Sequence, residues 1–429
     1  MSIGLQREFL SSHYRRWLIS SIQEKHTPKW IFLHASRTQN TSFLEIADEF
    51  AMQPHVRLEQ MYFRQKTRTI VLNVGTDEHE IVLKIFYLQE NAVPSSNATP
   101  LDKESSCLMS HDVEVKYLDL LSRLVFHHIT PHIVLPIYRS IISFARVQKL
   151  LRSSVDASVL RQISSNKPTD LFMAIFAEKA NHGTLTSLVR QDLVSLRRAQ
   201  LNYVLVAIIF QIVYTLACIH IRTPSFKHND LHTSNVLISS TDRAKLQNVH
   251  PSKQHYVRYI DENGSDAYID IMVCPYRTLL WDFFFSSINE DDARRWNLGP
   301  MIPNRTSIGI SSCRNSRVVA NQYTDIHKLI DTLEYILRGA NLWGKLEPCM
   351  VNFFNDVVPE QYKCAARDRD AEYKESLKLH TVHHTTARDL LSHPLFNSLR
   401  HPIDNSVAPL ETYDARRKLK EHAFPQNGK

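Results

Sequence analysis

The sequence predicts an α+β protein, with strand patterns gathered in its first half and helical patterns in its second half. Residues 56–88 have the apolar and polar pattern of strands. Residues 203–219 form a long apolar helical stretch, and residues 323–333 open a further helix. The length of 429 residues suits one two-lobed domain of about 250–300 residues with extensions, or two or three smaller domains.

The composition is that of an ordinary globular chain, with 43% hydrophobic and 22% charged residues. The net charge of +7 is mild and spread along the chain, so we expect weak attraction to polyanions and no specific nucleic-acid binding. The 6 cysteines form no C-x-x-C pair, which favours an intracellular, cytoplasmic setting over a disulfide or zinc framework. No secretory signal is expected at the N-terminus.

The first 54 residues are expected to form a helical extension, because apolar side chains recur there at helical intervals. Residues 68–74, a turn at 75–79 and residues 80–86 are typical of a β-hairpin. Lys84 lies inside the second strand between two apolar residues. It is either the outward residue of an alternating strand or, as in a V-A-I-K strand, a lysine that reaches nucleotide phosphates.

A polar loop at residues 89–111 precedes a helix predicted at 113–125. Glu114 in its first turn is either the ion-pair partner of Lys84 or a simple N-terminal acid favoured by the helix dipole. After an insertion at 146–168, a buried strand is predicted at 171–178, followed by a linker that starts at Lys179.

The apolar stretch 203–219 is 17 residues long, with Gln211 in its middle. It is either a membrane span slightly short of the usual length or a helix buried in a globular core. The chemical motif that lies shortly after it favours the buried helix, so no membrane span is expected.

That motif is the stretch His228-Asn-Asp-Leu-His-Thr-Ser-Asn235, followed by the apolar run Val236–Ile238. Its spacing, H-x-D-L-x-x-x-x-N, is that of a catalytic loop for phosphoryl transfer. A carboxylate at Asp230 must meet an acceptor hydroxyl while the amide oxygen of Asn235 holds magnesium beside the same phosphates. The loop between them therefore has to double back, and the apolar run anchors it as a short strand.

Further motifs lie after this loop. An insertion at about 240–275 has the pattern of an extra hairpin. Within residues 278–284 an apolar strand then ends in an Asp-Phe dipeptide, and Asp282 stands where a second magnesium-binding carboxylate is expected. Asp325 opens the next predicted helix and is either a buried acid that binds the backbone of the catalytic loop or a plain helix-start acid. Residues 385–396 read T-T-A-R-D-L-L-S-H-P-L-F, and residues 401–429 form a basic, loose tail.

Over residues 55–400 these motifs resemble the protein-kinase superfamily, and some details resemble divergent serine/threonine kinases of large DNA viruses. The resemblance implies a two-lobed protein-kinase-like fold. Residues 55–178 would form a small β-rich N-lobe and residues 179–400 a large helical C-lobe. A viral origin would place the protein in the host cytoplasm or the virion.

The resemblance also implies roles for single residues. Lys84 would bind the phosphates of ATP and pair with Glu114, and Asp230 would orient the acceptor hydroxyl and take its proton. Magnesium would be held by Asn235 and Asp282. The remaining implied site residues are Glu178 at the end of the buried strand and Ala180 in the linker, both beside the adenine, and the supporting residues His228 and Asp325. Removing one reactive side chain is expected to leave the fold largely intact.

The sequence departs from the kinase pattern at several places. No G-x-G-x-x-G precedes Lys84, and residues 64–67, where it should lie, hold no glycine, so backbone amides approach phosphates less closely. Phe284 replaces the glycine of D-F-G, and His232 stands where serine/threonine kinases commonly have lysine. No A-P-E motif is visible.

Three functions are therefore weighed. The first is an ATP- and Mg²⁺-dependent protein kinase that phosphorylates Ser or Thr of a protein substrate. The second is a small-molecule phosphotransferase, because D-L-H-x-x-N is also similar to aminoglycoside and choline phosphotransferases. The third is an inactive kinase-like binding module, motivated by the absent glycines and Phe284.

Overall fold

The computed structural model divides the chain into two compact units. Unit 1 takes the described residues up to Ser122 and the segment Val134–Lys179, and unit 2 takes Arg123–Ile133 and Ala180–Leu419. The structure describes residues 57–64, 69–75, 80–87, 110–143, 145, 171–241, 255–283, 286–296, 323–358, 385–400 and 409–419. The predicted extension 1–54 and insertion 146–168 lie outside the described residues.

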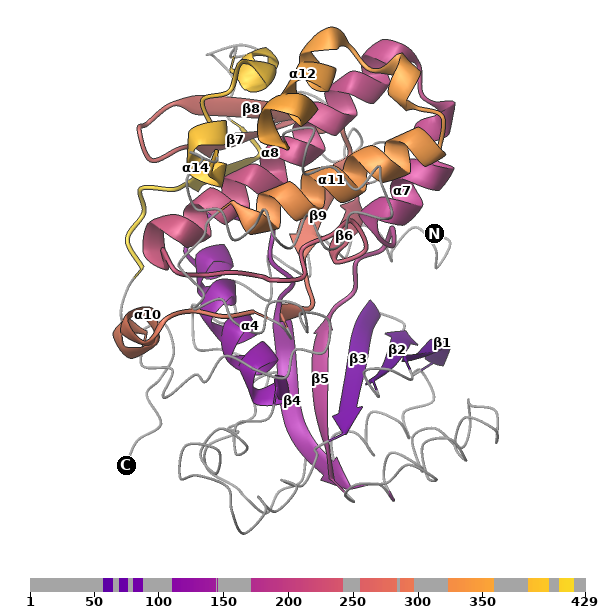
Figure 1. Ribbon diagram of the computed structural model, residues 1–429. Coiled ribbons are helices and arrows are strands. Elements are labelled where there is room, and N and C mark those ends of the chain that lie inside the picture. Colours follow the sequence, from indigo (N-terminus) through magenta and orange to yellow (C-terminus); the bar gives the residue numbers. More distant parts are fainter. Residues whose placement is uncertain are drawn as a thin grey trace, which may run out of the picture. The chain divides into compact units, whose positions relative to one another are not determined.

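Unit 1 is built on a five-stranded antiparallel sheet in the order β1-β2-β3-β5-β4 (Figure 1). The predicted hairpin forms, with Thr69 opposite Phe86 and Gly75 opposite Glu80. The strands are β1 Arg57–Arg64, β2 Thr69–Gly75, β3 Glu80–Tyr87, β4 Pro136–Ser143 and β5 Leu171–Glu178.

The centre of this sheet is covered on both faces. Leu83 and Ile85 on one face of β3 are buried, and so is Lys84 on the other face. Helix α4, Ser110–Phe126, packs against β3 through Glu114, and its apolar positions 117, 118, 120 and 121 are also buried. A strand with both faces covered explains why the apolar run around Lys84 is nearly continuous.

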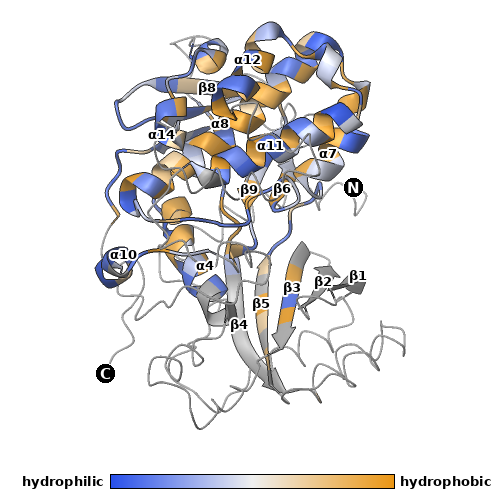
Figure 2. Cartoon of the chain, in the orientation of Figure 1, coloured by the Kyte–Doolittle hydropathy of each residue, from blue (hydrophilic) through white to orange (hydrophobic). Residues whose placement is uncertain are grey.

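Unit 2 surrounds helix α8, Arg198–Arg222. This helix is long and apolar enough to cross a membrane, yet 94% of its most apolar window is buried inside the protein. Gln211 in its middle donates to the carbonyl of Tyr276 at 3.0 Å and accepts the amide of Thr278 at 2.8 Å. The polar residue thus ties the helix to a strand, as suits a buried core helix. Figure 2 shows the hydrophobic colouring of α8.

Further helices of unit 2 contact this core. Helix α11 is amphipathic and packs on α7 and α12, while α8 contacts α14. Helices α10 and α12 were not predicted from the sequence. The bounds are α7 Leu185–Gln191, α10 Glu290–Arg295, α11 Thr324–Gly339, α12 Pro348–Val357 and α14 Ala387–Leu390, with 3₁₀ turns η1 Leu193–Ser195, η3 Trp343–Lys345 and η5 Pro394–Leu399.

Two small sheets complete unit 2. Strand β6, Val236–Ser240, pairs antiparallel with β9, Tyr276–Leu280. The predicted insertion hairpin forms from β7, Tyr256–Ile260, and β8, Asp266–Asp270.

The C-terminal segment differs from the loose tail that we predicted. Strand β10, Glu411–Asp414, pairs in parallel with β7, and Arg222 donates to the carbonyls of Ala415 and Arg417 at 2.7 and 2.8 Å. These contacts make the segment around β10 part of unit 2. Pairing between distant strands has no local signature in a basic sequence, which is why the prediction was wrong for residues 411–414.

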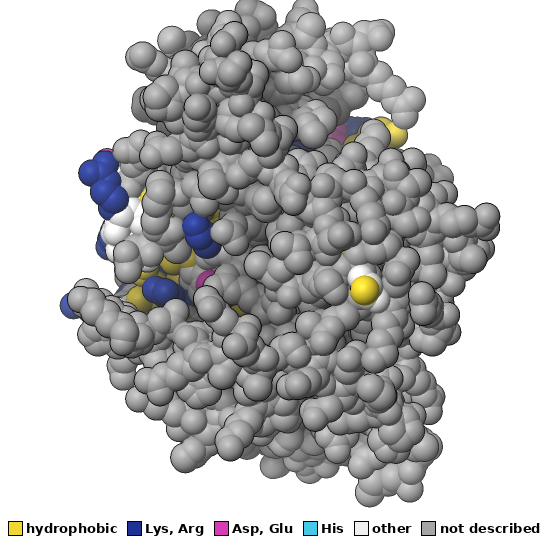
Figure 3. All heavy atoms as spheres, turned by 90° about the horizontal axis from the view of Figure 1, so that it is seen from below, with side chains coloured by type: hydrophobic (Ala, Val, Ile, Leu, Met, Phe, Trp, Pro, Cys, Tyr) yellow, Lys and Arg dark blue, Asp and Glu magenta, His cyan; other side chains and the backbone are white. Residues whose placement is uncertain are grey.

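Basic side chains are prominent on the face of the molecule shown in Figure 3. Among the described side chains that reach this face, Lys and Arg stand out more than Asp and Glu. This agrees with the net charge of +7.

Candidate functional site

In unit 1, Lys84 and Glu114 form a buried ion pair. The Lys84 Nζ atom lies 2.7 Å from Glu114 Oε1 and 3.0 Å from Oε2, and the two side chains are 5% and 0% exposed. The pair joins β3 to α4. Burying two charges is expensive, and such a pair is often no more stabilising than apolar residues of the same volume. Its presence therefore points to a need for a lysine held at this place.

Glu178 and Ala180 lie on either side of the boundary between the units. The Glu178 carboxylate accepts the amide of Leu135 at 2.8 Å, and its own amide donates to the Leu135 carbonyl at 3.0 Å. Glu178 therefore fastens the end of β5 to the segment before β4. Ala180 is partly exposed. A contact of either residue with a nucleotide base stays a prediction.

In unit 2, Asp325 holds the backbone of the predicted catalytic loop. This buried carboxylate at the start of α11 accepts the amides of His228 at 2.6 Å and Asn229 at 2.9 Å. That is the geometry expected of a buried acid that binds the loop, and not of a plain helix-start acid. Carboxylates that accept backbone N–H groups make strong, charge-assisted hydrogen bonds.

His228 supports the loop from its other side. Its ring is fully buried, its Nε2 atom lies 3.0 Å from the Trp281 carbonyl, and it packs on the ring of Phe283. Burial lowers the pKa of His228, although the charge of Asp325 opposes this shift. A neutral ring therefore links the loop to the end of β9.

The loop doubles back so that its carboxylate and amide meet. Asn235 Nδ2 donates to the Asp230 carbonyl at 2.9 Å and lies 3.2 Å from Asp230 Oδ2. Strand β6 anchors the C-terminal end of the loop, because Ile238 donates its amide to the Gly183 carbonyl at 2.8 Å. The sequence-predicted return of the chain between positions 230 and 235 is thus present in unit 2.

The Asp230 carboxylate is flanked by two basic side chains. Lys328 Nζ on α11 lies 2.6 Å from Asp230 Oδ1, and His232 Nε2 lies 3.6 Å from Oδ2. Burial raises the pKa of Asp230, but the His232 ring and the Lys328 ammonium lower it, and the net result is a pKa well below its usual range. The carboxylate is therefore ionised at neutral pH.

The pairing of β6 with β9 brings Trp281, the residue before Asp282, against Asn235. Val236 is opposite Leu280, and the Trp281 amide donates to the Asn235 carbonyl at 3.2 Å. Since Asn235 turns its amide nitrogen to Asp230, its amide oxygen lies on the opposite side of that group. Amide and carboxylate oxygens suit Mg²⁺, which commonly binds one or two protein ligands together with phosphates and water. The donor set of these two residues fits the ion.

The backbone is unusual at two of these positions. Asn229 has φ 61° and Asp282 has φ 66°, in the left-handed region that residues other than glycine seldom occupy. Such conformations persist where the surroundings fix them, and they gather at functional sites. Here Asn229 precedes the loop carboxylate Asp230, and Asp282 is the predicted second metal ligand.

The sequence reasoning missed Lys328. It lies three residues after Asp325, and on a helix these two positions share a face. That spacing is the signal that could have found it, once Asp325 was assigned to the loop. Lys84 and Glu114 belong to unit 1 and the other reactive residues to unit 2, so the meeting of both sets around one nucleotide stays a prediction.

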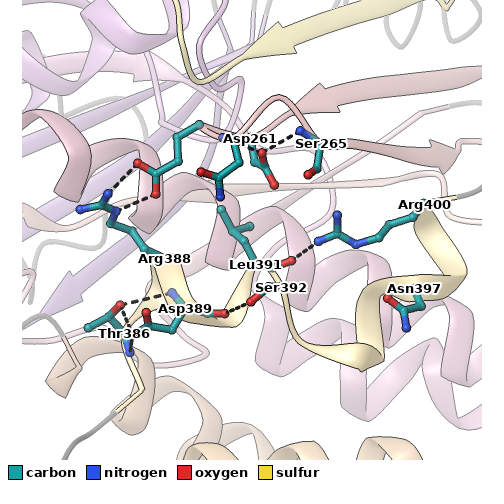
Figure 4. A pocket seen from close by; sticks show the side chains of 11 residues that line it. Asp261, Ser265, Thr386, Arg388, Asp389, Leu391, Ser392, Asn397 and Arg400 are labelled. Atoms are coloured by element: carbon teal, nitrogen blue, oxygen red, sulfur yellow. Dashed lines mark hydrogen bonds and ion pairs between the residues drawn. The ribbon is translucent and has the colours of Figure 1, made fainter.

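A separate pocket of about 780 Å³ lies in unit 2 between the insertion hairpin and the segment after α12. Figure 4 shows Thr386 turned toward Asp389, and Arg400 toward the backbone of Leu391. Arg388 forms two hydrogen bonds with Glu262, at 2.8 and 2.6 Å. The Arg388–Glu262 pair therefore links α14 to the turn of the insertion hairpin. The lining residues are Asp261, Glu262, Asn263, Ser265, Thr386, Arg388, Asp389, Leu391, Ser392, Asn397 and Arg400.

Comparison with known proteins gives a likeness to a viral protein. Over 301 residues the chain is 26% identical to a protein of Acanthamoeba polyphaga mimivirus named "Putative serine/threonine-protein kinase". The match takes in 68% of this chain and 59% of that protein, so the chain spans less than two thirds of its relative. No protein-family model matches the chain. The chain is thus similar to a kinase-like protein at low identity.

Proposed function

We propose that the protein is an ATP-dependent protein kinase that transfers the γ-phosphoryl group to Ser or Thr side chains of a protein. One observation carries the proposal: a carboxylate, Asp230, lies against Asn235 in a loop that β6 and β9 place beside Asp282. Phosphoryl transfer requires mainly positioning and neutralisation of phosphate charge, so few reactive side chains suffice.

Each residue then has a defined task. Asp230 accepts a hydrogen bond from the acceptor hydroxyl and takes its proton as the oxygen bonds to phosphorus. Asn235 and Asp282 provide oxygen ligands for Mg²⁺, and Lys84, kept in place by Glu114, contacts phosphate oxygens. Bound Mg-ATP supplies the transferable phosphoryl group, and ADP is the leaving group.

The proposal includes a two-lobed kinase-like fold with its N-lobe in unit 1 and its C-lobe in unit 2. It is supported by the five-stranded sheet with α4, by the largely helical second unit and by the named likeness of the mimivirus protein. We further propose that the protein acts in the cytoplasm.

The test is incorporation of labelled phosphate from Mg-ATP into the protein itself and into mixed protein substrates. Asp230→Ala is expected to lower the rate by about 10²- to 10⁴-fold, since it removes the group that orients the hydroxyl and takes its proton. Asp291→Ala is the matched control, because Asp291 is an exposed carboxylate on α10. Both variants are compared with the parent by thermal unfolding. Equal labelling by Asp230→Ala and the parent would remove the proposal.

A kinase-like binding module without activity is the second candidate. It is favoured by the absence of glycine from residues 64–67, where backbone amides would otherwise approach the phosphates. In that case the parent would incorporate no phosphate under any condition. Amino alcohols included as acceptors would reveal a small-molecule phosphotransferase instead.

A further inference from the structure

We propose that Lys328 is a positioning residue for the Asp230 carboxylate. The inference deepens the proposed function and rests on it. In this chain the loop position two residues after Asp230 is His232, so the loop itself supplies no lysine there. The structure brings an ammonium group to the same carboxylate from helix α11.

The contacts of the Asp230 carboxylate show which basic side chain binds it directly. Lys328 Nζ lies 2.6 Å from Oδ1, a short charge-assisted hydrogen bond. His232 Nε2 lies 3.6 Å from Oδ2, beyond the range of a normal hydrogen bond. The direct cationic contact is therefore the one with Lys328.

Helix α11 controls both parts of the loop through one face. Asp325 binds the backbone amides of His228 and Asn229, and Lys328, one turn later, binds the side chain of Asp230. Positions three residues apart on a helix lie next to each other. The backbone and the reactive carboxylate are thus fixed to the same rigid element, which restricts the rotamers that Asp230 can adopt.

The ammonium also sets the charge of the carboxylate. With Oδ1 bound to Lys328 and Oδ2 near Asn235, the carboxylate stays ionised and is presented in one orientation. Lys328 is about one third exposed, so its ammonium still reaches solvent. An ionised, oriented acceptor suits a loose transition state, in which alignment of the hydroxyl matters more than basicity.

The experiment compares steady-state kinetics of Lys328→Met, Lys328→Arg and Lys345→Met with the parent. Losing a charge-assisted hydrogen bond is expected to lower kcat by about 10- to 100-fold in Lys328→Met, with KM for ATP changed by less than about threefold. Lys328→Arg should recover most of the rate. Within the described part of the chain, Lys345 donates to the carbonyl of Val194 at the surface, so Lys345→Met should match the parent.

The outcomes separate this inference from the function on which it rests. If the parent is active and Lys328→Met has the same kcat, the positioning role is wrong and the proposed kinase stands. If the parent is inactive, both fail. Thermal unfolding controls for folding, and Lys328→Leu is a second variant without a hydrogen-bond donor: a folded Lys328→Leu with parental kcat would equally overturn the role.

Discussion

Two lysine–carboxylate pairs in this protein have nearly the same length and very different surroundings. Lys84 lies 2.7 Å from Glu114, and Lys328 lies 2.6 Å from Asp230. The first pair is 5% and 0% exposed, whereas the second is 36% and 29% exposed. The nitrogen–oxygen distance alone therefore does not distinguish the two pairs.

Their surroundings give them different roles. Withdrawing the Lys84 pair from water carries a desolvation penalty that its attraction barely offsets, so removing one partner leaves a buried charge. Water screens the Lys328 pair, which therefore contributes little stability. We infer that disrupting the first pair affects folding and activity together, and that disrupting the second affects activity first.

The largest expected effect is that of Lys84→Met. This change removes the ammonium that pairs with the buried Glu114 carboxylate, and it should lower the free energy of unfolding by about 3–5 kcal/mol as measured by urea denaturation. The expectation from sequence that such a change would spare the fold is thereby revised, because the sequence did not reveal how deeply the pair is buried.

A double variant serves as its control. Lys84→Met with Glu114→Gln removes both charges, so most of the lost stability should return while phosphate transfer stays low. If the double variant is no more stable than Lys84→Met, the charge of the buried Glu114 carboxylate is not the cause of the lost stability.

A buried histidine that stays neutral gives a smaller effect, which depends on pH. Burial lowers the pKa of His220 from 6.5 to about 4, although the charge of Asp325 opposes the shift. Above pH 6.5 both the folded and the unfolded ring are neutral, and stability is unaffected. As the pH falls from 6.5 to 4, only the unfolded state gains a proton, so stability declines by about 3 kcal/mol in total.

The measurement is the free energy of unfolding between pH 4 and 7 for the parent and His220→Gln. The variant should lose less stability over that interval, whatever its stability at neutral pH. Buried His228 and the carboxylates are common to both proteins and cancel in the difference. Parallel pH curves would show that His220 is protonated alike in both states.

The local elements of the fold could be predicted from sequence, because their signals are local. The hairpin of β2 and β3, strand β5 and the insertion hairpin have apolar patterns and turns that few other structures fit. The loop from His228 to Asn235 was recognised from residue types at fixed intervals, because these determine which groups the loop presents.

Contacts between distant segments could be predicted only where a motif suggested them, as for Lys84 with Glu114 and for Asp325 with the loop backbone. Lys328 was missed although it follows Asp325 by one helical turn. The pairing of β10 with β7 has no motif or periodicity that indicates it. The burial of Lys84 results from the packing of α4 on the sheet.

The smallest loss of stability is expected at an ion pair on the protein surface. Arg388 and Glu262 form a two-pronged ion pair with side chains 45% and 25% exposed. Because water screens it, Arg388→Ala should lower the free energy of unfolding by less than about 1 kcal/mol. In about 1 M NaCl, where the screening length is about 3 Å, this difference should nearly vanish, whereas the deficit of Lys84→Met should persist. Urea unfolding of both variants at low and high salt measures this. A salt-insensitive deficit in Arg388→Ala would show that exposure does not separate the two kinds of pair.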